Sequence, residues 1–221
     1  MKSIALSLAI LAALALSPAA EAATHQGHAA AGTNATSADT RISTKQAATR
    51  AVLRDLWVEH VFWIRNYVTA SAANSQTGKK IAADQVVANA TAISGAIASF
   101  YGKPAGDRML TLLAGHWGAV KEYSDATFDK GGKGQIEATS KLIANAKEIA
   151  AFLASANPNL PETSLVGLLT AHGAHHITQV QQISKADYAG EATTWAAMRS
   201  HMFTIADALA DALAKQFPEK F

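Results

Sequence analysis

The sequence of 221 residues contains no cysteine. This absence excludes disulfides, thiolate metal sites, iron–sulfur clusters, covalent haem and a lipid anchor on an N-terminal cysteine. Strand signals are also scarce, because period-two alternation and β-branched runs are missing. The 19 basic and 17 acidic residues nearly balance, which argues against nucleic acid as the main partner. No glycine-rich phosphate loop, nucleophile elbow or HExxH motif occurs.

Residues 1–22 have the pattern of a secretory signal peptide. Lys2 precedes a short apolar run, Ile4 to Leu16, and Ala20-Glu21-Ala22 matches a cleavage site. The run is too short to span a membrane, and we expect no transmembrane anchor in the remaining chain. The protein is therefore expected to be periplasmic or secreted.

A small, polar stretch follows, which predicts a disordered leader over residues 23–43 and one helical domain over residues 44–221. If cleavage follows Ala22, His25 becomes the third residue of the mature chain. A chain that begins with a free amine and has histidine as its third residue can bind an ion through nitrogens in a square-planar arrangement, the geometry that Cu(II) and Ni(II) favour. His25 is thus a candidate N-terminal metal ligand, although an ordinary tail explains the same residues.

One interval of 56 residues recurs along the chain. It separates His60, His116 and His172, and it also separates a second set, Asn89, Asn145 and His201. The same interval relates further sets of identical residues: Leu56, Leu112 and Leu168; Gly78, Gly134 and Gly190; Ile93, Ile149 and Ile205. A fixed interval of this length predicts three tandem αα-hairpins that bury their faces against one another.

Apolar residues spaced by three and four predict an all-α bundle of about six helices. The expected helices cover residues 44–73, 80–101, 105–128, 135–155 and 190–216, with the fifth helix starting at Pro161-Glu162 and carrying its stripe as far as Ile183. The two polar sites of each repeat are equidistant from its expected turn. Each histidine should therefore face its asparagine, or His201 in the third hairpin. Whether the hairpins close around an axis or stack in a line is left open.

The repeated histidines lie within the buried stripes, and a buried imidazole needs partners for both ring nitrogens. One interpretation is structural: Asn89 and Asn145 satisfy the rings, and the polar layer only fixes register. The other is a metal site, because neutral imidazole is a common ligand for zinc, copper, nickel and iron. The asparagines would then orient the rings by accepting their N–H groups.

The third repeat is richer in histidine, with His172, His175 and His176 on one helical turn. His172 and His176 are four residues apart, so both can point at one ion. Two arrangements are therefore possible for a metal site. One is shared by His60, His116 and His172; the other is local to His172, His176 and His201.

Three segments carry a resemblance to known proteins: LWVEHVFWIRNYV, NPNLPE with LLTAH, and MRSHMFTIADALADALAKQFPEKF. Together they resemble an uncharacterised family of small bacterial all-helical proteins over about residues 50–221, which implies an all-helical domain. His172 and His176, followed by Gln179, are also similar to the HxxxH pair of DinB-type bundles, whose three-histidine sites bind metal. The threefold repeat departs from that second pattern.

These observations favour an exported helical protein that binds copper or zinc through buried histidines and acts as a carrier, buffer or sensor. A second hypothesis is a metal-dependent enzyme with three histidine ligands and an open coordination position. A third is a non-catalytic scaffold whose histidine and asparagine layer is structural. A metal ion is the expected partner in the first two.

Overall fold

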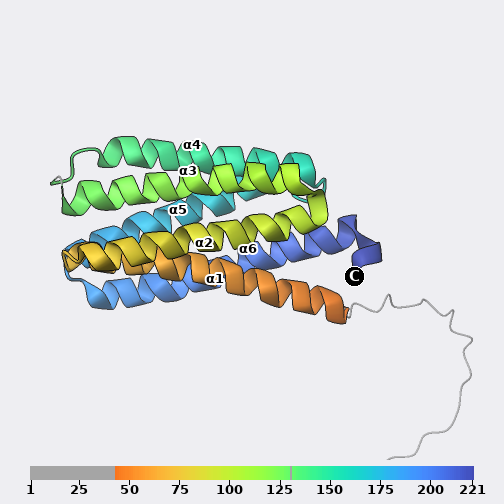
Figure 1. Cartoon of the computed structure of the whole chain (residues 1–221), viewed down its shortest axis with the longest axis horizontal. Coiled ribbons are helices and arrows are strands. Elements are labelled where there is room, and N and C mark those ends of the chain that lie inside the picture. Colours follow the sequence, from red (N-terminus) through yellow and green to blue (C-terminus); the bar gives the residue numbers. More distant parts are fainter. Residues whose placement is uncertain (1–42, 130) are drawn as a thin grey trace, which may run out of the picture. The chain divides into compact units, whose positions relative to one another are not determined.

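The computed structural model describes residues 43–129 and 131–221, and these residues form helices without any strand. The helices are α1 (Thr44–Ala72), α2 (Gln76–Tyr101), α3 (Lys103–Phe128), α4 (Gln135–Ala156), α5 (Glu162–Ser184) and α6 (Tyr188–Gln216), followed by a short 3-10 helix, η1 (Pro218–Lys220) (Figure 1). The predicted all-α bundle is confirmed. The predicted signal peptide, nearly all of the predicted leader, and His25 lie outside the described residues.

Side-chain caps set several helix starts. The Ser43 hydroxyl accepts a hydrogen bond from the backbone N–H of residue 46, and the Ser75 hydroxyl accepts one from Gly78. Asp187 caps α6 in the same way. Such caps satisfy backbone donors that a helix start leaves unpaired. Because Ser75 is the cap, α2 begins four residues earlier than predicted.

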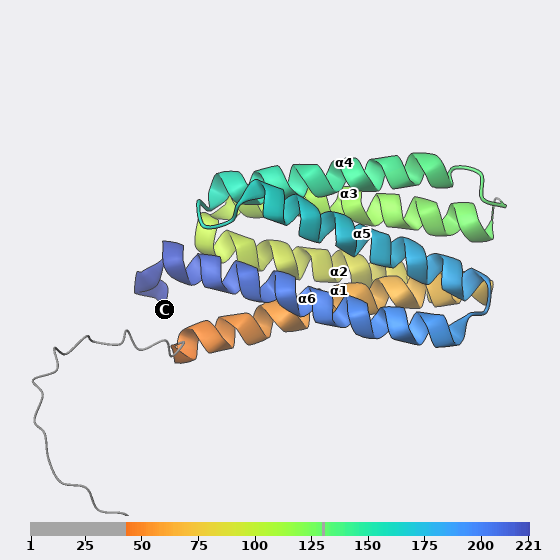
Figure 2. The ribbon, with the colours of Figure 1, turned by 180° about the vertical axis from the view of Figure 1, so that it is seen from behind.

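The three hairpins close into a ring. Each helix packs against the next, and α6 returns to pack beside α1 (Figures 1 and 2). Helices α1, α3 and α5 also contact one another in the middle, whereas α2, α4 and α6 fill the outer positions between them. The question left open by the sequence is thereby decided: the hairpins surround an axis. Every first helix of a hairpin faces that axis.

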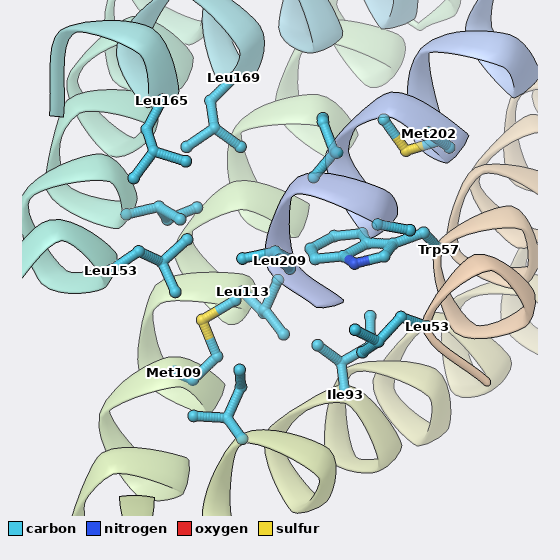
Figure 3. Close-up of a cluster of buried hydrophobic side chains, with 14 of the residues drawn as sticks. Leu53, Trp57, Ile93, Met109, Leu113, Leu153, Leu165, Leu169, Met202 and Leu209 are labelled. Atoms are coloured by element: carbon cyan, nitrogen blue, oxygen red, sulfur yellow. The ribbon is translucent and has the colours of Figure 1, made fainter. Parts of the chain in front are cut away.

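A large apolar cluster fills one part of the bundle. Trp57 of α1, Met109 of α3, and Met202 and Leu209 of α6 meet there (Figure 3). Met198 of α6 belongs to the same cluster. Both of these methionine side chains are fully buried. Burying one large apolar side chain stabilises a fold by about 1.5–3 kcal/mol, so this cluster is a main source of stability. The two methionines belong to that packing.

From the sequence we expect no stretch after residue 22 that could span a membrane, but helix α2 is long and apolar enough to do so by length and composition. Within the bundle, α2 packs between α1 and α3. Its side chains Val86, Ile93 and Ile97 are buried there. Core packing therefore accounts for part of the apolar character of this helix, whereas Ile81 and Val87 of α2 are exposed.

Candidate metal centre

Four histidines from the three inner helices meet on the bundle axis. His60 comes from α1, His116 from α3, and His172 and His176 from α5. One ring nitrogen of each lies within 4.8 Å of those of the other three. All four side chains are buried, with exposed fractions of 5% or less. We call this set the four-histidine group.

The rings lie near the spacing that four ligands of one tetrahedral ion would have. Nitrogens bound at about 2.0–2.1 Å to a tetrahedral ion lie about 3.3 Å apart, with ring centres about 5 Å apart. The Nε2 atoms of His172 and His176 are 3.1 Å apart. The six distances between ring centres run from 4.5 Å for this pair to 6.0 Å for His60 and His176. The side chains thus converge on a volume that suits a single ion.

The third hairpin supplies two of the four rings because it differs from the others at one position. Subtracting the interval of 56 from His176 gives Val120, and then Ile64. These two residues lie in a buried apolar cluster. His176 therefore occupies the place of an aliphatic side chain, one turn after His172 on the same face of α5.

Burial keeps the four rings neutral at physiological pH. Loss of water around the ring, together with the neighbouring His116, lowers the pKa of His60 to about 3. The same loss of solvent lowers the pKa of His116 to about 4. Burial and then the neighbouring imidazoles also hold the pKa of His172 and His176 well below the usual value. Neutral imidazole is the form that binds metals.

Several ring nitrogens of the group have no hydrogen-bond partner. These are both nitrogens of His60, Nε2 of His116 and Nδ1 of His172. Leaving a buried polar group unpaired costs about 1–3 kcal/mol. Four neutral rings that converge on one volume, three of them with unpartnered nitrogens, fit a transition metal better than they fit a hydrogen-bonded layer.

The surroundings leave little space for anything larger than an ion. A cavity of about 10 Å³ borders His60, His116 and His172, and apolar residues such as Trp57 and Leu113 complete its lining. The Trp57 ring stands edge-on to His60, with 5.9 Å between ring centres. A cavity of this size corresponds to about one water molecule.

The second repeated set has a different role from the one expected. Asn89 donates a hydrogen bond from Nδ2 to the carbonyl of Leu56 at 3.0 Å, and Asn145 donates to Leu112 at 2.9 Å. In the third hairpin, Nε2 of His201 lies 2.8 Å from the carbonyl of Leu168. All three carbonyls belong to the residue four before the hairpin's axial histidine. These bonds tie each outer helix to its inner helix.

The expected contact between histidine ring and asparagine amide is therefore not made. The Oδ1 atoms of Asn89 and Asn145 have no hydrogen-bond partner, so neither amide accepts a ring N–H. The reason is angular: the rings turn toward the axis, whereas the amides approach the outer flank of the inner helix. Equal height along a hairpin does not place two side chains on the same side.

The structure combines the two arrangements that the sequence left open. His60, His116 and His172 share one site, and His176 joins them, whereas His201 lies outside the group. His201 is half-buried between α6 and α5, and its ring centre is 5.5 Å from that of His175. Sequence reasoning gave His175 no ligand role.

A buried carboxylate lies one turn below the group, and the sequence analysis missed it. Glu191, 3% exposed, accepts two hydrogen bonds from Arg65 at 2.6 Å and one from Gln179 at 3.1 Å. The Arg65 guanidinium lowers the pKa of Glu191. Gln179 is itself buried, three residues after His176. The interval offered a signal, since Gln179 stands where the other hairpins carry Tyr67 and Tyr123.

Comparison with known proteins adds no family or relative: no family model, no curated protein and no solved structure matches this chain.

Proposed function

We propose that this protein is an exported transition-metal-binding protein that holds one copper or zinc ion in the four-histidine group, as a carrier, buffer or sensor. The observation that carries the proposal is the convergence of four buried, neutral rings, three of which have ring nitrogens without a hydrogen-bond partner. Imidazole suits both metals, and a tetrahedral set suits Zn(II) and Cu(I).

The closed surroundings favour binding over catalysis. A catalytic zinc site keeps a position open for water or substrate, commonly with three protein ligands. Here a fourth histidine, His176, takes that position, and the adjoining cavity has a volume of only about 10 Å³. A substrate larger than water has no room beside the ion. Reversible storage or transfer of the ion is the chemistry that this geometry supports.

The scaffold hypothesis is disfavoured by the unpartnered nitrogens. A polar layer that only fixed register would gain stability from hydrogen bonds between its members. In this layer only His172 and His176 lie within hydrogen-bond distance of each other, and His60 has no such partner. An ion would satisfy one nitrogen of every ring at once.

The test is metal binding by purified protein and its variants. His60→Gln, His116→Gln, His172→Gln and His176→Ile should each weaken binding of Zn(II) or Cu(I) by at least about 100-fold, since even groups that only orient a ligand are worth about 10–100-fold. His201→Asn is the matched control, because the first two hairpins carry asparagine at that position. It should retain the tight site.

Two results would refute the proposal. One is wild-type protein that binds neither metal more tightly than His60→Gln does. The other is equal binding by wild type and His176→Ile, which would mean that the ring of His176 is not a ligand.

A further inference from the structure

The six histidines of the described residues fall into two sets that meet on one turn of α5. Four form the buried group, and the remaining two, His175 and His201, form a half-exposed pair on the outside of the same turn. His175 follows His172 by three residues and directly precedes His176. Since a helix rises 1.5 Å per residue, the pair and the group are at nearly the same height.

The hydrogen bond of His201 fixes which ring nitrogen carries the proton. A carbonyl oxygen can only accept, so Nε2 of His201 must donate to Leu168 across their 2.8 Å separation. The other nitrogen, Nδ1, then holds the lone pair. Histidines that bind metals typically donate their second N–H to a backbone carbonyl in this way, which orients the ring. His201 is thus prepared as a ligand through Nδ1.

The hydrogen bond alone does not require histidine. Asn89 and Asn145 make the equivalent bond in the first two hairpins. What His201 adds over asparagine is a second, basic nitrogen, and His175 lies beside it. Their ring centres are 5.5 Å apart, within the range of 4.5–6.0 Å found in the buried group.

We propose that His175 and His201 form a second, outer site for the same transition metal, through which the ion reaches the four-histidine group. This inference rests on the proposed function. The outer ion has two imidazole ligands and keeps water at its other positions, because both side chains are half-exposed. When the ion moves inward, it exchanges its bound water and the imidazoles of His175 and His201 for the four imidazoles of the buried group. All of these rings bind as neutral ligands, so the exchange releases no net proton and involves no change of oxidation state. In the empty group His172 and His176 share one N–H between their Nε2 atoms, and when both bind the ion this proton moves to Nδ1 of the ring that carried it.

The test uses Co(II) as the probe, with the whole chain. A tetrahedral Co(II) ion in the buried group gives an intense visible absorption, whereas a hydrated outer ion of higher coordination number absorbs weakly, so the two sites are distinguished by their spectra. Stopped-flow absorption follows filling of the buried group. Equilibrium dialysis gives the number of ions bound.

The variants are His175→Gln and His201→Asn, the second of which keeps a donor for the Leu168 carbonyl. In both, the intense band should reach its wild-type amplitude but grow at least about tenfold more slowly, and the weaker of two bound ions should be lost. Ser200→Ala, an exposed neighbour, serves as a control and should match wild type.

Each other result has a defined meaning. Unchanged rates and stoichiometry in both variants overturn the outer site and leave the proposed function standing. A folded His201→Asn protein without the intense band also overturns it, because His201 would then belong to the buried group. If wild type shows no intense band and binds no ion, the proposed function fails as well.

Discussion

The burial of four neutral imidazoles predicts a steep dependence of stability on pH in the metal-free protein. In the unfolded chain each ring protonates near pH 6.5, whereas burial lowers the folded-state pKa of His60 to about 3 and that of His116 to about 4. The pKa values of His172 and His176 are also held well below the usual value. As pH falls below 6.5, the unfolded state therefore binds more protons than the folded state, and the free energy of unfolding decreases.

The magnitude follows from the number of rings. Each ring that stays neutral in the fold lowers the free energy of unfolding by about 1.4 kcal/mol between pH 7.5 and 5.5, so four rings together lower it by about 5 kcal/mol. Most domains have a total stability of about 5–15 kcal/mol, so the effect should be large. Carboxylates contribute little in this window, because their unfolded pKa values lie near 4.

Urea denaturation in the presence of a chelator, followed by circular dichroism at a series of pH values, measures this loss. His176→Ile removes one ring and restores the residue type of the first hairpin, so about a quarter of the loss should disappear. Saturating metal should raise the free energy of unfolding at every pH, by about 2.7 kcal/mol at a metal concentration 100 times the dissociation constant. Above pH 5.5 the metal should not change how steeply the free energy of unfolding depends on pH. A loss below about 1.5 kcal/mol in the wild type would refute the reasoning, since the rings would then protonate inside the fold.

Three further sets of substitutions test packing in the bundle. Asn145→Leu removes the side-chain donor to the Leu112 carbonyl. The free energy of unfolding, measured by urea denaturation, should fall by about 1–2 kcal/mol. An unchanged value would mean that this hydrogen bond does not stabilise the fold. Arg65→Ala removes the partner of the buried Glu191 carboxylate and should cost about 1–3 kcal/mol at pH 7, less than for a fully buried pair, because the Arg65 side chain is 38% exposed. The double change with Glu191→Gln should recover part of this loss, and no recovery would contradict the ion-pair explanation. Gly106→Ala should destabilise the fold, because a Cβ there would lie 2.7 Å from the Ala98 Cβ. Gly95→Ala should stabilise the fold by about 0.5–1 kcal/mol, because a Cβ at residue 95 of α2 meets open space. Thermal melts in which both variants shift the melting temperature in the same direction would contradict these contacts.

The sequence was sufficient to predict the helices and the heights of their polar residues. Spacing by three and four located the buried stripes, and the interval of 56 placed His60, His116 and His172 at equivalent positions. These features are local, since a helix has a fixed rise per residue and a hairpin folds back at its turn. The first and third turns lie at residues 73–75 and 185–187, as the symmetry of the polar sites predicted.

The tertiary structure alone decided which side chains meet. Periodicity gives the position of a residue along its helix, but the direction of its side chain relative to other helices depends on how the helices pack. Closure of the ring brought His176 into the group and left His201 outside, and it directed Asn89 and Asn145 to backbone carbonyls instead of histidine rings. Closure is a long-range event, fixed by packing α6 against α1 across the whole chain, and no local pattern in the sequence encodes it.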